Sequence, residues 1–206
     1  MTQLGLMLAV LVAGYVIGSI SFAVLLSRAR GVDIFKVGSG NPGATNVMRA
    51  LGKPAGYACF VLDALKGMVA ALVGKGVALT YGIGDPFLLA TFGLIGAILG
   101  HSFSVFLRFR GGKGVATSVG GLLILMPWVI LTGAVVWVGT YFTFRYVSLA
   151  SLLLGASLPL TALVIGEGLP KQVLCLLLAI LIFFRHRANI KRLLNGTEHR
   201  AGPMKS

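Results

Sequence analysis

Long apolar segments fill most of the chain, and short polar segments separate them. A helix needs about 20 mostly apolar residues to cross the hydrocarbon core of a bilayer. Segments that meet or approach this length lie at residues 4–26, 54–80, 86–100, 115–144, 147–166 and 170–184. The pattern therefore predicts an all-α, polytopic integral membrane helix bundle that forms one membrane-embedded domain over residues 1–206.

The segment at residues 115–144 decides the number of spans, because it contains no charged residue and is too long for one crossing. As a continuous helix it would be roughly 45 Å long, well beyond a hydrocarbon core of about 30 Å. Pro127 lies near its middle. The segment is either one kinked helix, giving six spans, or two shorter helices, giving seven.

Composition and charge choose between these topologies. Only 11% of the residues are charged, so an ordinary water-soluble domain, with about 25%, is excluded. With seven spans and an outside N-terminus, 15 of the 18 Lys and Arg residues fall on the inner side, as the positive-inside rule requires. With six spans the basic tail would be translocated. We therefore expect seven transmembrane helices, with the N-terminus outside and the C-terminus cytoplasmic.

Several ionisable or reactive side chains lie within the apolar segments. Asp63 and Lys66 are one helical turn apart, and either a proton relay or a structural pair accounts for them. His101 ends an apolar segment, where an interfacial cap is the simpler explanation. Cys59 and Cys175 lie in apolar runs, so we expect neither a disulfide nor a metal site.

Two polar clusters are rich in glycine. The first, at residues 37–49, combines glycines with Ser, Asn and Thr and ends at Arg49. The second, at residues 108–118, places a glycine loop and Lys113 directly before a helix. Glycine loops let successive N–H groups face one point, and a helix N-terminus favours negative charge, so both clusters indicate anion binding. The second lacks the Gly-Lys-Ser/Thr order of a nucleotide P-loop.

A third, basic cluster follows the last apolar segment at residues 185–194. His186 and Asn189 are one helical turn apart there and share a face. Lipid anchoring explains such a cluster as well as substrate binding does. Ser148 lies on the same predicted side of the membrane, close enough in topology to join an anion site.

Together the three clusters predict a site for a substrate with several phosphates, or for two phosphorylated substrates. The few acidic residues provide no carboxylate dyad and no Ser-His-Asp set, and no His is followed five residues later by Asp. No recognition motif for nucleic acid accompanies the charge, so we expect no nucleic-acid partner. A transporter or channel for a phosphorylated anion is the alternative class, although we find no internal repeat.

The three clusters resemble the signature motifs of the bacterial acyl-phosphate:glycerol-3-phosphate acyltransferase family. The motifs match at Gly38 to Arg49, at Phe109 to Thr117 and at Arg185 to Arg200, and the last includes Gly196-Thr197-Glu198. The resemblance implies a seven-helix enzyme of the bacterial inner membrane whose site faces the cytoplasm. Such an enzyme transfers a fatty acyl group from acyl phosphate to glycerol 3-phosphate, yielding lysophosphatidic acid and phosphate, in phospholipid synthesis.

The resemblance also implies the site residues and partners. It places in the polar site Ser39, Arg49, Lys113, Ser148, His186 and Asn189, while the loop glycines supply backbone amides. We hypothesise that the acyl phosphate is bound by Ser39, Gly40, Asn41, Gly43, Thr45, Asn46, Gly112 and Gly114. We hypothesise that glycerol 3-phosphate is bound by Arg49, Lys113, Ser148, His186 and Asn189. No cofactor, metal or obligate protein partner is expected beyond the substrates and membrane lipids.

The chemistry expected of such a site is positioning and charge stabilisation, because an acyl phosphate is already an activated anhydride. We assign the catalytic roles to Lys113, His186 and Ser39. The acceptor hydroxyl must lose a proton, either to His186 or to an oxygen of the donor phosphate.

Overall fold

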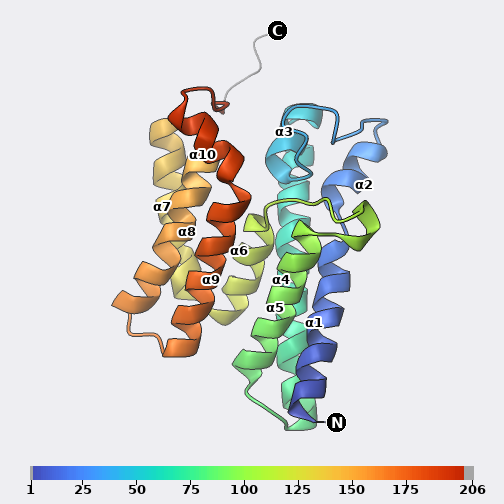
Figure 1. Cartoon of the computed structure of the whole chain (residues 1–206), viewed down its shortest axis with the longest axis vertical. Helices are drawn as coiled ribbons and strands as arrows, with labels where there is room; N and C mark the ends of the chain where they lie inside the picture. Colours follow the sequence, from blue (N-terminus) through green and yellow to red (C-terminus); the bar gives the residue numbers. More distant parts are fainter. Residues whose placement is uncertain (1, 202–206) are drawn as a thin grey trace. The chain divides into compact units, whose positions relative to one another are not determined.

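The computed structural model describes residues 2–201, and helices are the only regular elements over that range (Figure 1). The outer ends of the expected domain, residue 1 and residues 202–206, lie outside the described residues. The chain divides into two compact units, Met1–Leu125 and Met126–Ser206. The helices of the first are α1 (Gln3–Ser19), α2 (Phe22–Arg28), α3 (Ala44–Leu51), α4 (Lys53–Tyr81), α5 (Pro86–Ser102), the 3₁₀ turn η1 (Val105–Leu107) and α6 (Val115–Leu125). Those of the second are α7 (Pro127–Phe144), α8 (Val147–Val164), α9 (Leu169–Arg185) and α10 (Arg187–Leu194).

In the first unit the long helices α1, α4, α5 and α6 pack through small residues. A side chain at Gly96 would overlap the carbonyl of Leu11, and one at Gly100 would overlap the carbonyl of Tyr15. Glycine at these positions therefore lets the backbones of α1 and α5 touch. Many large apolar side chains on the outer surfaces, such as Leu4 and Leu79, are exposed, as expected for helices that face lipid.

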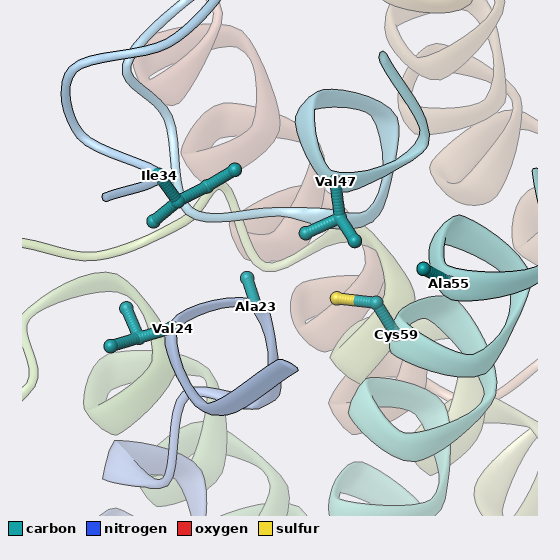
Figure 2. Close-up of a cluster of buried hydrophobic side chains, with 6 residues drawn as sticks. All are labelled: Ala23, Val24, Ile34, Val47, Ala55 and Cys59. Carbon is teal, nitrogen blue, oxygen red and sulfur yellow. The ribbon is translucent and has the colours of Figure 1, made fainter. Parts of the chain in front are cut away.

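The polar end of the first unit has an apolar core of its own. Figure 2 shows its buried side chains, which come from α2, the following loop, α3 and α4. They are Ala23, Val24, Ile34, Val47, Ala55 and Cys59. This core fastens the polar loop before α3 to the ends of the long helices, so the loop has a rigid base.

In the second unit α8 packs against α7 and α9, and the short α10 packs against α8 and α9. Trp137 and Tyr141 stack with ring centroids 5.1 Å apart on α7. Trp137 also donates its ring N–H to the Ser151 hydroxyl of α8, at 3.4 Å. The tail after α10 returns to the start of α8, where the backbone N–H of Ala201 donates to the carbonyl of Arg145.

The predicted spans agree with the helices at the level of element and position. Among the described residues, five helices are long and apolar enough to cross a membrane, and the bent pair α9 and α10 makes up to six. The shorter apolar helix α6 is additional. The charge-free segment ends one helix at Leu125 and begins another at Pro127, so it is two helices and not one kinked helix.

Three features of the fold differ from the expected pattern. The first span is broken at Ile20, so it consists of α1 and α2. The helix α3 lies inside the cluster interpreted as loop, because Gly43 at its N-cap and Gly52 at its C-cap isolate a short amphipathic segment. The last span ends at His186, where the chain bends by 61° into α10.

Candidate active site

Asn46 organises the polar loop of the first unit. Its side chain is buried and donates through Nδ2 to the carbonyls of Ile34 and Val37, at 3.2 and 3.0 Å. Its Oδ1 accepts from the backbone N–H of Ser39, at 3.0 Å. A single amide on α3 therefore shapes the loop that carries Ser39. The sequence analysis placed Asn46 among the groups that bind acyl phosphate, but its polar atoms already have partners within the loop.

The expected residues of the first cluster are thus close together on one loop and one helix. Ser39, Gly40, Asn41 and Gly43 lie on the loop before α3, and Thr45 lies on its first turn. Arg49 is half-buried in the last turn of α3.

The glycine amides of this loop were expected to face acyl phosphate, but two of them are bonded within the loop. The N–H groups of Gly40 and Gly43 donate to the carbonyls of Val37 and Asn41. Gly38 and Gly40 have positive φ, so these glycines let the chain turn within the loop. The amides of Gly40 and Gly43 therefore close the loop on itself.

The second cluster is a strained loop that leads into α6. Arg108 and Phe109 are consecutive non-glycine residues in the left-handed region, with φ of 53° and 60°. Such residues cost on the order of 1 kcal/mol each, and strain of this kind concentrates at functional sites. Lys113 is half-buried on the loop, directly before the N-terminus of α6. The amide of Gly112 donates to the carbonyl of His101, at 3.0 Å. We had expected this amide to face a substrate anion, and it is instead bonded within the protein.

A basic hollow of about 580 Å³ lies beside this loop in the first unit. Three arginines line it, Arg28, Arg108 and Arg110, together with one acid, Asp33. The guanidinium of Arg110 lies 4.4 Å from the centroid of the Phe35 ring. These arginines were not among the expected site residues.

The ionisable residues within the spans of the first unit meet one another. Asp63 Oδ1 lies 2.7 Å from Lys66 Nζ, which is the ion pair that the sequence spacing allowed. The same carboxylate oxygen lies 3.6 Å from His101 Nδ1. His101 is in the last turn of α5, but it is buried beside Asp63, which corrects its interpretation as an interfacial cap.

Glu198 is the centre of the polar cluster in the second unit. Its Oε1 accepts from the Ser148 hydroxyl at 2.8 Å and from Asn189 Nδ2 at 2.7 Å. Its Oε2 accepts from Arg192 Nε at 2.7 Å. Burial by itself raises the pKa of Glu198, but these hydrogen bonds and the Arg192 charge outweigh it and hold the pKa below its ordinary value.

The structure brings Ser148 and Asn189 together on Glu198, a residue that was expected only as part of the third motif. Both side chains bind a carboxylate of this chain. Glu198 is the only acidic residue after Glu167 in a strongly basic tail, which is the signal that could have identified it.

His186 stands at the bend between α9 and α10. Its Nδ1 lies 2.8 Å from the carbonyl oxygen of Ile182. A carbonyl only accepts hydrogen bonds, so Nδ1 carries the hydrogen and, in the neutral ring, Nε2 is the acceptor nitrogen. The ring is buried, at 3% exposed, and the hydrogen bond fixes its orientation.

The helices and clusters define a class of protein: a multi-pass helical membrane protein whose polar chemistry lies in two glycine loops of the first unit and one carboxylate-centred cluster of the second. Among the described residues there is no group of His, Cys, Asp and Glu arranged to hold a metal ion. The model of the family described as glycerol-3-phosphate acyltransferase matches residues 8–196. The chain belongs to this family.

Relatives and solved structures agree over nearly the whole length. The glycerol-3-phosphate acyltransferases of Aquifex aeolicus and Mesorhizobium japonicum are 44% and 47% identical, covering 94% and 96% of this chain and 98% and 97% of theirs. The crystal structure of PlsY (YgiH), an integral membrane glycerol 3-phosphate acyltransferase in its glycerol 3-phosphate form, is similar with a TM-score of 0.87 and 42% identity, covering 95% of this chain and 96% of that one. Its lysophosphatidic acid form gives 0.85 and 41%, with 97% of each chain covered.

Proposed function

We propose that the protein transfers a fatty acyl group from acyl phosphate to glycerol 3-phosphate, giving lysophosphatidic acid and inorganic phosphate. The observation that carries the proposal is the near full-length similarity to an acyltransferase solved in a glycerol 3-phosphate form and in a lysophosphatidic acid form. These are the acceptor and the product of the reaction. Acyl phosphate is the proposed donor because the polar clusters are rich in cations, while the described residues offer no Ser-His-Asp arrangement for a covalent intermediate.

The proposed setting is a bacterial inner membrane, with seven spans, an outside N-terminus and an active site that faces the cytoplasm. The distribution of Lys and Arg supports this topology, because 15 of the 18 then lie on the inner side. To reach seven spans, α6 must be counted in addition to the six candidate spans. This helix is apolar but only 11 residues long.

In the first unit, Ser39, Arg49 and Lys113 are the proposed contacts for substrate phosphate. Arg49 and Lys113 supply full positive charges, and Ser39 lies on the loop that Asn46 holds in shape. Lys113 also lies close to the N-terminus of α6, where aligned backbone dipoles favour an anion. These groups stabilise the charge that develops when phosphate leaves.

In the second unit, His186 is the proposed acceptor of the hydroxyl proton. The hydrogen bond from Nδ1 to Ile182 leaves Nε2 as the basic nitrogen of the neutral ring. Ser148 and Asn189 are the proposed partners for the polar groups of glycerol 3-phosphate, and Glu198 orients both.

The proposed step forms one bond and breaks one. The acceptor hydroxyl oxygen attacks the acyl carbon, and the bond from that carbon to the phosphate oxygen breaks. The hydroxyl proton passes to His186, while the electron pair of the broken bond leaves with inorganic phosphate. The alternative proton acceptor is an oxygen of the departing phosphate, which needs no protein base.

The test is phosphate release from purified protein in lipid, with palmitoyl phosphate as donor and with or without glycerol 3-phosphate. Wild-type protein should release phosphate and form lysophosphatidic acid only when the acceptor is present. Lys113→Ala should abolish both signals, whereas Lys75→Ala, which removes an exposed lysine of α4, should not. Failure of the wild type in both assays would overturn the proposal, and anion flux in proteoliposomes would then test a transporter.

His186→Gln separates the two proton acceptors. A general base contributes about 10² to 10⁴ in rate, so a loss of that size in kcat is expected. If kcat stays within about tenfold of wild type while KM rises, His186 binds substrate and the phosphate takes the proton.

A further inference from the structure

The proposed function leaves unused a buried ionic cluster in the first unit. It consists of Asp63 and Lys66 on α4 and His101 on α5, whose residues are only 1%, 5% and 8% exposed. Asp63 Oδ1 contacts both partners, at 2.7 Å from Lys66 Nζ and 3.6 Å from His101 Nδ1. Charged groups inside a membrane helix are costly, so their retention there is a functional signal in itself.

The cluster also contacts the segment between α1 and α2, where the first span is broken. Lys66 Nζ donates to the carbonyl of Ile20, at 2.8 Å, and lies 5.8 Å from the centre of the Phe22 ring. On the other side of the carboxylate, Cys59 Sγ lies 3.7 Å from Asp63 Oδ2. Lys66 and Cys59 therefore contact the Asp63 carboxylate in addition to His101.

His101 in turn supports the glycine loop that carries Lys113. The Gly112 amide donates to the His101 carbonyl at 3.0 Å. A side chain at Gly112 would overlap the His101 imidazole at Nε2, and one at Gly111 would overlap the His101 carbonyl. The loop backbone thus lies directly on the ring and peptide of His101, which explains why residues 111 and 112 are glycines.

We propose that Asp63 and His101 are positioning residues for the loop Gly111–Gly114, with Lys66 holding Asp63 in place. Asp63 Oδ1 lies 3.6 Å from Nδ1 on one side of the ring, and Nε2 on the other side faces Gly112. The ring sets where the loop backbone lies, and hence where Lys113 meets substrate phosphate. The inference rests on the proposed function only for this last step, because the packing of the loop on His101 is independent of any substrate.

Two uncharged double variants at Asp63 and Lys66 separate the effect of the contact with His101 from the effect of the buried charges. Asp63→Asn/Lys66→Met removes both charges but keeps a polar side chain beside His101 Nδ1, whereas Asp63→Leu/Lys66→Met removes the polar contact as well. Replacing both members of a buried ion pair is often neutral for stability, while removing one member is strongly destabilising. We therefore expect both double variants to fold with thermal midpoints close to each other.

Activity should separate these variants although stability does not. The Asn/Met variant should keep kcat/KM within about threefold of wild type, and the Leu/Met variant should lose at least about tenfold. Thr91→Val, which removes a buried hydroxyl elsewhere on α5, is the control and should keep wild-type activity. Equal kcat/KM in the two double variants, whether high or low, would overturn the proposal.

A second measurement does not depend on the ionic pair. Gly112→Ala should push the loop off the ring, and His101→Ala should remove the ring, so each should lower kcat/KM by tenfold or more. Because both act through one contact, the double variant should lose little more than the worse single variant. Losses that multiply would show two independent effects and would contradict the proposal.

A proteolytic readout keeps this inference separate from the catalytic proposal. Trypsin cleavage after Lys113, followed by the mass of the released fragment, reports how firmly the loop is held without any substrate. His101→Ala should cleave at least several-fold faster than wild type and than Thr91→Val. If acyl transfer is absent in wild type but this difference remains, the positioning of the loop stands and the proposed function fails. Unchanged cleavage would overturn the positioning role.

Discussion

One buried side chain holds the loop before α3 in the first unit, and another holds the tail after α10 in the second, and the two side chains differ in charge. In the first unit the neutral amide of Asn46 donates twice and accepts once within a loop. In the second unit the carboxylate of Glu198 accepts three hydrogen bonds. An amide can satisfy both donors and acceptors of a backbone, whereas a carboxylate gathers donors only. The loop before α3 is therefore organised around backbone groups, and the cluster of the second unit is organised around polar side chains.

The largest expected effect comes from removing the charged centre. Glu198→Ala leaves the donors of Ser148, Asn189 and Arg192 without their acceptor. Hydrogen bonds to a charged group contribute about 1.5–3 kcal/mol each, but Arg192 is partly exposed and water recovers part of the loss. We expect a total loss of about 3 kcal/mol, seen as a thermal midpoint roughly 5–10 °C lower in detergent. Glu167→Ala, which removes a more exposed acid of the same unit, is the control.

A smaller effect is expected from the neutral centre. Asn46→Ala leaves the Ile34 and Val37 carbonyls and the Ser39 amide without this partner, at a cost of about 2 kcal/mol. Thermal unfolding measures the loss, and Asn195→Ala at an exposed position is the control. If instead the midpoint is unchanged and only activity falls, Asn46 binds substrate, as its sequence context suggested.

The difference in charge makes only one of the two clusters sensitive to acid. The pKa of Glu198 is lowered in the folded protein, so its contribution to stability is complete above the unfolded pKa of about 4.3. That contribution is lost as the pH falls through the lowered folded pKa. The midpoint difference between wild type and Glu198→Gln should therefore be constant from pH 8 to about pH 5 and shrink below about pH 4.3. The difference between wild type and Asn46→Ala should persist at acid pH.

The smallest effect is expected from an ion pair on the surface of the first unit. Lys36 Nζ lies 3.8 Å from Asp33 Oδ2, and the two side chains are 83% and 50% exposed. Solvent screens such pairs, which contribute between 0 and about 1 kcal/mol. Lys36→Ala should shift the thermal midpoint by less than about 2 °C, and a larger shift would mean that this loop is held by more than its buried core.

Hydropathy predicted where most of the long helices lie, because the bilayer imposes simple limits on the length and polarity of each span. The excess length of the segment at residues 115–144 left one kinked helix or two helices possible, and the structure has two. The short helix α3 could not be predicted in the same way, because it is far shorter than a span and packing of Val47 in the buried cluster adds to its stability.

The sequence predicted which residues gather in the polar clusters better than it predicted what each residue does there. Ser148 and Asn189 come together as expected, but the sequence could not show that Glu198 joins them, since only the fold returns the tail to α8. The amides of Gly40 and Gly112 were expected to face an anion, and instead they close the loops. A spacing of residues indicates which groups are near one another, whereas the direction of each N–H depends on backbone angles that spacing does not encode.

The shortness of α6 has a consequence for how the chain is assembled in a membrane. Eleven residues cover only about 16 Å, roughly half of a hydrocarbon core of about 30 Å, so this segment cannot hold a transmembrane position alone. Its partners are α4 and α5, and glycines on both sides let α4 and α6 touch, with Gly120 against the Ala64 carbonyl and Gly67 against the Thr117 carbonyl. Both partner helices precede α6 in the chain. During synthesis this short apolar helix therefore emerges only after the two helices that receive it have been made.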